Sequence, residues 1–228
     1  MPLSVVTFDI GQTLVDLDLD FLATRLAQRG ANVPAAALHA AAPDAWRTYE
    51  ALTEAGASHP WHELMRTFLT GAGVANPDPL VEWLYAQQAT CNLWRKPIAP
   101  MIDLVRELRT AGVAIAAVSN SEGHLADLLE EIALASLFDA IIDSGRIGIA
   151  KPDPRIFVLT LEELDVKPDV VVHVGDSWAA DVEGALAAGW HAIWYRSRAS
   201  AAEGDDRVPI VRNADETRAA LRAFGVPA

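Results

Sequence analysis

The sequence has a single cysteine, Cys91, so an internal disulfide is excluded and no cysteine cluster can hold a metal ion. This scarcity is typical of a protein from a reducing compartment, and we expect Cys91 to lie in the core. A signal peptide is missing as well, because the first residues, MPLSVVTFD, have no basic region or small-residue cleavage site and are typical of a β-strand. We therefore predict a cytoplasmic protein.

Long hydrophobic runs are absent, although 51% of the residues are hydrophobic. Charged residues, glycine or proline interrupt each run well before it reaches the roughly 20 residues of a membrane-spanning helix. We therefore expect a soluble chain that has no membrane partner. Its 228 residues are enough for one substantial core, or for one core and a small accessory domain.

Basic residues are also few. The chain has 18 Lys and Arg against 31 Asp and Glu, which gives a formal net charge of -13. Neutralising the phosphates of a nucleic acid requires clustered Lys and Arg, so this composition argues against a nucleic-acid partner. The same charge would repel a small anionic ligand, and its site would therefore need a metal ion or a few local cations.

Short β-rich apolar runs alternate with helical patterns along most of the chain. The apolar runs are residues 3–8, 113–119, 139–144, 169–175 and 190–195, and the helical patterns are residues 99–112, 121–134 and 153–164. This alternation predicts an α/β fold with a doubly wound parallel sheet. In such a sheet a ligand binds beyond the carboxyl ends of the strands, where the strand order reverses.

One segment has no strand pattern. Residues 16–96 instead contain alanine-rich helical stretches separated by GANVP, GASHP and GVANPDP. We predict that residues 16–96 form an all-helical cap, inserted after the first strand and placed above its end, and that residues 1–15 and 97–228 form the core. The stretch SRASAAEGDD, residues 197–206, is expected to be a surface loop.

Polar side chains follow three of the predicted strands, and a lysine precedes one predicted helix. These residues are Asp9, Ser119, Asn120, Lys151, Asp176 and Asp181. Singly, each could be only a helix cap or a solvated loop residue. Together they indicate a functional site, because the carboxyl ends of parallel strands share one edge of the sheet.

The order and spacing of these residues resemble the haloacid dehalogenase-like hydrolase superfamily. Its four motifs are matched by FDIGQTL, VSNS, GIAKPDP and GDSWAADVEGALAAG, and the resemblance extends over essentially the whole chain. The fold that it implies is a Rossmann-like core. The helical segment after the first motif looks like the small helical cap of that family.

The resemblance implies a role for each motif residue. Asp9 would be the nucleophile, which takes the transferred group as a covalent aspartyl intermediate that water then cleaves. Mg²⁺ would be held by the carboxylates of Asp9 and Asp176 and the carbonyl of Gly11. Asp181 would bind the metal directly or through water, or would instead orient Lys151.

The remaining motif residues would bind a phosphorylated substrate. Lys151 would contact both Asp9 and the phosphoryl oxygens. Ser119, with the backbone of Asn120 or Ser121, would donate hydrogen bonds to the negative charge on those oxygens.

The sequence departs from the phosphatases of this family at Gly11. Those enzymes usually carry a second aspartate two residues after the nucleophile, which protonates the leaving group and later activates water. Loss of a general acid typically lowers the rate by about 10²- to 10⁴-fold, unless the leaving oxygen is a weak base or another group takes over. Asp16, Asp18 and His124 are candidates, but each is equally explained as a helix-entry or surface residue.

Three functions are compatible with these motifs. The favoured one is a magnesium-dependent phosphatase for small phosphorylated metabolites, with a preference for anhydride, acyl or aryl phosphates. A second is another group transfer on the same scaffold. The dehalogenase branch also lacks the second acid, but it uses no metal and usually has a neutral residue in place of Asp176. The phosphonatase branch needs a cap lysine, and residues 16–95 contain none. The third is a non-catalytic descendant that binds a phosphorylated ligand or a protein partner.

Substrate choice is expected to lie with the helical cap. Its cations Arg47, Arg66 and Arg95 could hold a second anionic group, whereas its tryptophans are expected to pack in the core of the cap itself. Trp178 could line the site or pack under the adjacent loop. The apolar faces of the cap could also pair two subunits, so a homodimer stays open.

Overall fold

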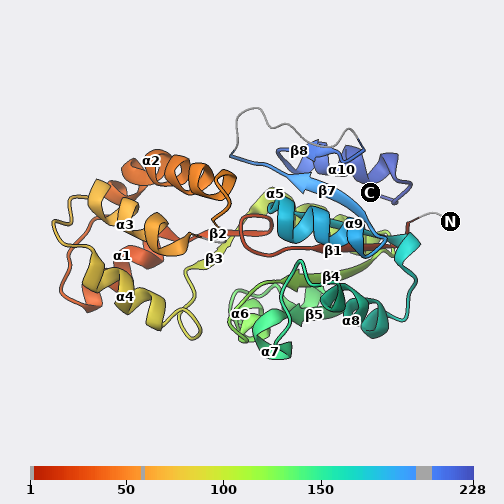
Figure 1. The fold of residues 1–228 in the computed structure, drawn as a ribbon, viewed down its shortest axis with the longest axis horizontal. Coiled ribbons are helices and arrows are strands. Elements are labelled where there is room, and N and C mark those ends of the chain that lie inside the picture. Colours follow the sequence, from red (N-terminus) through yellow and green to blue (C-terminus); the bar gives the residue numbers. More distant parts are fainter. Residues whose placement is uncertain (1–2, 58–59, 199–206) are drawn as a thin grey trace. The chain divides into compact units, whose positions relative to one another are not determined.

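The computed structural model describes residues 3–57, 60–198 and 207–228 (Figure 1). The chain divides into two compact units: Met1–Leu17 with Trp94–Ala228, and Asp18–Leu93. The sequence placed the boundaries after residue 15 and before residue 97. The first unit is slightly larger than the predicted core, because residues 15–17 pair with residues 94–97 and both segments belong to this unit.

A parallel six-stranded sheet forms the centre of the first unit in the described part of the chain. Its strand order is β5-β4-β1-β6-β7-β8. The strands are β1 (Val5–Phe8), β4 (Ala114–Ser119), β5 (Ala140–Asp143), β6 (Val171–Gly175), β7 (His191–Tyr195) and β8 (Ile210–Val211). The first five lie in the predicted apolar runs, whereas two residues are too few for a pattern to reveal β8. The predicted Rossmann-like α/β fold is confirmed.

Helices connect these strands. The predicted helical segments contain α5 (Ala99–Thr110), α6 (Leu125–Glu131) and α8 (Pro154–Leu164). The other helices of the unit are α7 (Ser144–Ile147), α9 (Gly184–Ala187) and α10 (Ala214–Ala223), with a π-helical turn η3 (Trp178–Glu183) and the 3₁₀ turns η1 (Ala135–Leu137) and η2 (Pro168–Val170).

The strand order reverses beside β1. The chain moves from β1 to β4 and β5 in one direction, then crosses to β6 on the other side of β1 and continues to β7. Because crossovers between parallel strands are right-handed, α5, which lies between β1 and β4, and α9, which lies between β6 and β7, are on opposite faces of the sheet. The carboxyl ends of β1 and β6 are therefore the switch point at which sheets of this kind bind ligands.

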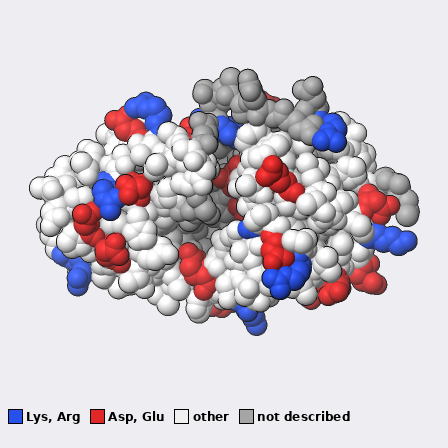
Figure 2. Space-filling view, viewed as in Figure 1, with Lys and Arg blue, Asp and Glu red and all other residues white. Residues whose placement is uncertain are grey.

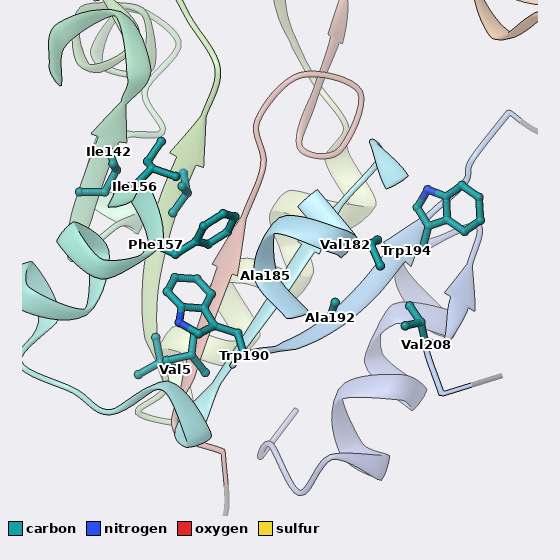
Figure 3. Close-up of a cluster of buried hydrophobic side chains, with 12 residues drawn as sticks. Val5, Ile142, Ile156, Phe157, Val182, Ala185, Trp190, Ala192, Trp194 and Val208 are labelled. Atoms are coloured by element: carbon teal, nitrogen blue, oxygen red, sulfur yellow. The ribbon is translucent and has the colours of Figure 1, made fainter. Parts of the chain in front are cut away.

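A cluster of buried apolar side chains joins the sheet to α8, η3 and α9 (Figure 3). Phe157 of α8 meets Trp190 edge to face, with ring centroids 5.1 Å apart. Gly184 allows α9 to approach closely, because a Cβ there would lie 2.8 Å from the Phe157 ring. Burying one such large apolar side chain is worth about 1.5–3 kcal/mol, so this layer holds the segment that follows β6 firmly against the sheet.

A two-stranded antiparallel ribbon, β2 (Val15–Leu17) with β3 (Trp94–Pro97), stands at the two ends of the helical segment. The sequence did not predict this ribbon. Strands of three and four residues are too short to show the alternation of a strand, and they lie at the edges of a strongly helical region.

The second unit consists of helices in its described residues: α1 (Leu19–Gln28), α2 (Ala35–Glu54), α3 (Trp61–Gly71) and α4 (Asp78–Ala86). Trp46 packs edge to face on Phe68, with ring centroids 5.9 Å apart, and Trp61 is 2% exposed. Packing within this unit therefore explains both tryptophans.

None of the described helices combines the length and the apolar character needed to cross a membrane. Most basic side chains in the view of Figure 2 lie beside acidic ones. Cys91 is half-buried and forms no disulfide, so its predicted core position was wrong. Of the predicted surface loop, residues 199–206 lie outside the described residues.

Candidate active site

Three strand ends bring the predicted polar residues to one edge of the sheet. Asp9 follows β1, Ser119 ends β4 and Asp176 follows β6. Asp9, Asp176 and Asp181 each offer a carboxylate oxygen, and these oxygens lie within 4.8 Å of one another. The parallel register of β1 with β4 and β6 is what places residues so distant in sequence side by side.

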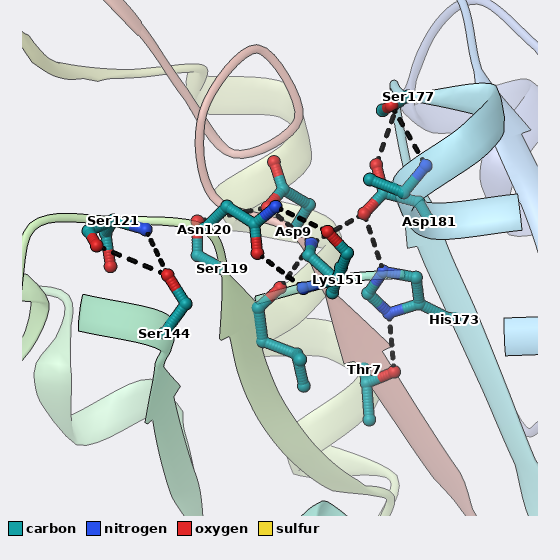
Figure 4. A network of polar contacts seen from close by, with 12 residues as sticks. Thr7, Asp9, Ser119, Asn120, Ser121, Ser144, Lys151, His173, Ser177 and Asp181 are labelled. Atoms are coloured by element: carbon teal, nitrogen blue, oxygen red, sulfur yellow. Dashed lines mark hydrogen bonds and ion pairs between the residues drawn. The ribbon is translucent and has the colours of Figure 1, made fainter. Parts of the chain in front are cut away.

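Lys151 is the centre of this cluster (Figure 4). Its Nζ donates to Asp9 Oδ1 at 2.8 Å, to Asp181 Oδ1 at 2.5 Å and to the Val118 carbonyl at 2.6 Å. These acceptors use all three hydrogens of the ammonium group. Lys151 is 5% exposed, so its Nζ is held in one place between the two carboxylates.

The charges of the pair Lys151 and Asp181 stabilise each other. Burial alone would lower the pKa of Lys151, but Asp181 and Asp9 outweigh burial and raise it. Burial alone would raise the pKa of Asp181, but Lys151 and a hydrogen bond with His173 outweigh it and hold that pKa below its usual range. Lys151 is therefore a permanent cation, and Asp181 is its permanent counter-ion.

Asp9 is held through one of its two oxygens. Ser119 Oγ donates to Asp9 Oδ1 at 3.0 Å, and Lys151 donates to the same oxygen. No hydrogen bond reaches Oδ2 from the described residues. Burial raises the pKa of Asp9, Lys151 opposes the rise and the neighbouring Asp181 adds to it.

The contacts of Asp181 support orientation of Lys151, one of the alternatives that the sequence left open. Oδ1 binds Lys151 and lies 3.2 Å from His173 Nε2, and Oδ2 accepts from the backbone N–H of Ser177 at 2.8 Å. Gly175 leaves room for this carboxylate, because a Cβ there would stand 2.3 Å from Asp181 Cγ. Both oxygens of Asp181 are thus used within the protein.

The side chain of Asn120 binds the main chain of Lys151, whereas the predicted substrate contact is made by the backbone of Asn120. Asn120 Nδ2 donates to the Lys151 carbonyl at 2.9 Å, and Asn120 Oδ1 accepts from the Lys151 N–H at 2.8 Å. The N–H of Ser121 donates to Ser144 Oγ at 3.0 Å, so it is already in use as well. Of the predicted phosphate donors, Ser119 and Lys151 are the ones whose polar atoms meet at Asp9.

The position of Gly11 has space for a side chain. A Cβ built there meets nothing within 4 Å, and its backbone is outside the left-handed region. The three candidates for a replacement acid have other partners. Asp16 pairs with Arg198 at 2.5 Å, Asp18 caps α1 by accepting from the Phe21 N–H, and the exposed His124 pairs with Asp127.

The predicted cations for a second anionic group all form ion pairs with acidic side chains. Arg47 pairs with Asp44, Arg66 with Glu63 and Asp78, and Arg95 with Glu131.

Trp178 packs against Trp194, with ring centroids 4.7 Å apart, and Trp194 Nε1 donates to the Asp176 carbonyl at 2.9 Å. The packing alternative for Trp178 is therefore supported, and the pair braces the turn that carries Asp176.

His173 is a site residue that sequence reasoning missed. It lies in β6, is 0% exposed and connects Asp181 to Thr7. Burial lowers its pKa. One signal could have revealed it: a histidine inside the apolar run VVVHVG must find polar partners, because an unpaired polar group in a buried strand is costly.

Asp176 has the chemistry of a metal ligand. Its carboxyl pKa lies well above the usual value, because it is partly withdrawn from solvent and stands beside Asp9 and Asp181. A divalent cation relieves this kind of repulsion, and hard cations such as Mg²⁺ prefer oxygen ligands. Asp9, Asp176 and Asp181 therefore offer carboxylate oxygens that could hold a metal, and the Gly11 carbonyl stays a predicted ligand.

Comparison with known proteins gives a consistent picture. Residues 3–189 match the family of haloacid dehalogenase-like hydrolases. The chain is 32% identical to haloacid dehalogenase-like hydrolase domain-containing protein 3 of Bos taurus over 85% of this chain and 82% of that protein. It is 35% identical to a phosphoserine phosphatase of Thermus thermophilus over 53% of this chain and 49% of that protein. A solved putative HAD hydrolase of Bacillus subtilis, bound to magnesium, has a TM-score of 0.67 at 22% identity and covers 97% of this chain and 99% of that one.

Proposed function

The chain belongs to the haloacid dehalogenase-like hydrolase family, and on that premise we propose that it is a magnesium-dependent phosphatase of small phosphorylated metabolites. The observation that carries the proposal is the set of Asp9, Asp176 and Asp181 around Lys151. Such a concentration of carboxylates can accept a phosphate only if cations offset their charge. Similarity to a phosphoserine phosphatase also supports a small phosphorylated metabolite as the substrate.

Magnesium suits the oxygen donors of this site. Asp9, Asp176 and the Gly11 carbonyl would hold it, with Asp181 bound directly or through water. The pKa of Asp176 is raised because the charge of Lys151 does not offset burial and the repulsion of Asp9 and Asp181, and a divalent cation would supply the missing positive charge. When bound, Mg²⁺ would neutralise negative charge on the phosphate and on the phosphoryl group in transfer.

Asp9 is the nucleophile of the proposed reaction. One oxygen of its carboxylate forms a bond to phosphorus while the bond from phosphorus to the leaving oxygen breaks, and an aspartyl phosphate remains. Water then attacks phosphorus, the bond to Asp9 breaks, inorganic phosphate leaves and the carboxylate is restored. Ser119 and Lys151 fix Asp9 Oδ1 and hence the direction of attack.

Gly11 restricts the leaving group. With no carboxylic acid two residues after Asp9, the leaving oxygen must depart with little protonation. Anhydride, acyl and aryl phosphates have such leaving groups, so we propose them as the preferred substrates.

The test is release of inorganic phosphate from acyl, aryl, sugar and nucleotide phosphates, with Mg²⁺ and with a chelator. We expect magnesium-dependent turnover that disappears in Asp9→Asn while the variant still folds. Turnover that survives in Asp9→Asn would remove Asp9 as nucleophile.

Two other functions have their own outcomes in the same experiment. The missing acid at Gly11 also favours a carbon-centred hydrolase, which would release halide from 2-haloacids in chelator and leave every phosphate intact. Binding of Mg²⁺ or of a phosphate ester with no turnover of any compound would identify a non-catalytic binding protein.

A further inference from the structure

We propose that His173, oriented by Thr7, is a positioning residue that fixes Lys151 through Asp181. This role rests on the proposed function, because Lys151 is the cation that fixes Asp9, the proposed nucleophile. His173 itself lies in β6, two residues before Gly175, and its polar side-chain contacts are with Thr7 and Asp181 and not with Asp9.

Thr7 and His173 face each other across neighbouring strands. They are register partners in the β1–β6 pair, and Thr7 Oγ1 lies 2.8 Å from His173 Nδ1. On the other side of the ring, Nε2 lies 3.2 Å from Asp181 Oδ1, which also binds Lys151 (Figure 4). The chain of contacts Thr7, His173, Asp181, Lys151 and Asp9 is therefore continuous.

Each member of this chain can play only one hydrogen-bonding role. Asp181 is an ionised carboxylate and accepts only, so His173 Nε2 must carry the proton. Nδ1 of the neutral ring is then an acceptor, and the Thr7 hydroxyl must donate to it. Asp181 thus selects the tautomer of His173, and the Thr7 hydroxyl, whose other acceptor is the Val172 carbonyl at 3.5 Å, holds the ring orientation by donating to Nδ1.

His173 can affect Lys151 because both side chains contact the same oxygen, Asp181 Oδ1. Asp181 is held by three donors: Lys151 Nζ, the Ser177 N–H and His173 Nε2. Without His173, nothing in the described residues resists the pull of Lys151 on Oδ1 from the strand side. Asp181 Oδ1 could then move toward Lys151 Nζ, and the ammonium group would lose the fixed position from which it donates to Asp9 Oδ1.

A merely structural role for His173 makes different predictions. The ring also packs near Phe157 and Trp190, with centroid distances of 6.1 and 6.4 Å. If packing were its whole function, His173→Phe would preserve the rate and Thr7→Val would have no kinetic effect. A positioning role requires both substitutions to act on kcat.

The kinetic experiment compares Thr7→Val, His173→Phe and His173→Gln in the full chain. We expect kcat to fall roughly 10- to 100-fold in His173→Phe, with KM changed little, and less in His173→Gln, whose amide can still donate to Asp181. In a Lys151→Met background, His173→Phe should cause no further loss, because its effect passes through Lys151. Independent losses that multiply would overturn the proposal.

Thr160→Val is the matched control for Thr7→Val. Thr160 is also 0% exposed, but its hydroxyl donates to the Ile156 carbonyl within α8. We expect the two valine variants to lose similar thermal stability, and only Thr7→Val to lose kcat. Equal kcat in both would contradict the positioning role.

A measurement without substrate separates this proposal from the proposed function. Two-bond ¹H–¹⁵N correlation spectra of ¹⁵N-histidine-labelled protein should show His173 protonated at Nε2 alone, and Thr7→Val should shift the Nδ1 resonance, because Nδ1 loses its hydrogen-bond donor. The hydrogens of the Lys151 ammonium should be protected from exchange in the wild type and lose protection in His173→Phe. If the wild type hydrolyses no phosphate, the proposed function fails while these spectra still decide the position of Lys151. Protonation at Nδ1, or unchanged protection in His173→Phe, would overturn the proposal.

Discussion

Gly11 leaves open the place where a second carboxylate would stand. A Cβ at this position meets no atom within 4 Å, and the backbone conformation suits any residue. We predict that Gly11→Asp folds normally and accelerates hydrolysis of alkyl phosphates, whose leaving oxygens need a proton, by about 10²-fold or more. The gain should shrink for aryl phosphates, and a plot of rate against leaving-group pKa should become flatter.

Gly11→Asn is the control for this substitution, because it has the same size without an acidic proton. It should leave the dependence on leaving-group pKa unchanged. A flat dependence in the wild-type protein itself would show that another acid is already present.

Asn120 connects the end of β4 to the loop of Lys151 by two hydrogen bonds. We predict that Asn120→Ala lowers stability by about 1 kcal/mol and also lowers kcat, because the main chain of Lys151 loses its anchor. Asn213→Ala is a matched control, since Asn213 caps α10 by accepting from the Glu216 N–H. Its loss of stability should be similar, with kcat unchanged; equal kcat in both variants would contradict the anchoring role.

At the scale of single elements, the loop after β4 depends on one carboxylate. Asp143, 4% exposed at the end of β5, accepts from Ser121 Oγ at 2.6 Å and from the N–H groups of Gly123, Leu125 and Gly145. We predict that Asp143→Ala lowers the free energy of unfolding by about 3 kcal/mol, measured by urea denaturation, because several buried donors lose their acceptor together.

Asp127→Ala is the control for Asp143→Ala. Asp127 is an exposed carboxylate of α6 that pairs with His124. An exposed pair contributes little, so the expected loss is below about 0.5 kcal/mol. Equal losses in the two variants would mean that Asp143 does not organise the loop.

Sequence patterns predicted the long elements well and the short ones poorly. The runs that became β1, β4 and β6 are mostly apolar because both faces of their strands are buried, and this pattern is visible without a structure. The ribbon of β2 and β3 depends on pairing between residues far apart in the chain. Its three or four residues contain no periodic signal, so no local pattern could reveal it.

On the scale of the whole molecule, the carboxylates of the site couple stability to pH. Burial, Asp9 and Asp181 raise the pKa of Asp176 well above its ordinary value of 3.8. The folded protein therefore binds this proton more tightly than the unfolded chain. The resulting stability is fully present below pH 3.8 and is lost as the pH rises through the raised pKa.

We therefore predict that the metal-free protein loses stability as the pH rises above about 4, with a slope of at most about 1.4 kcal/mol per pH unit for one proton. Magnesium should reduce the loss, because it favours the ionised carboxylates. Urea unfolding over a pH series, in chelator and in Mg²⁺, measures both effects. Asp176→Asn should weaken the pH dependence in chelator; the same slope in the variant would assign it to another group.

The residues of the candidate site that stand at turns near the strand ends were predictable from the sequence. Asp9, Ser119, Lys151 and Asp176 were found because each stands at a turn beside the switch point. The partners beneath and beside them were not, since the sequence does not show which side chains meet across strands. His173 looked like part of an apolar run, and nothing in the sequence pointed to the contacts of the Asn120 side-chain amide with the main chain of Lys151.

The β2–β3 ribbon has a consequence for how this chain can change in evolution. Leu17 is paired with Trp94, and the Asp18 N–H donates to the Leu93 carbonyl. The two ends of the helical segment are therefore adjacent. Closing a long insertion at such a stem costs little more entropy than closing a short one. Residues 18–93 could therefore be lengthened, shortened or exchanged without altering the register of the sheet. Selection can then act on this helical segment separately from the reacting groups at the strand ends.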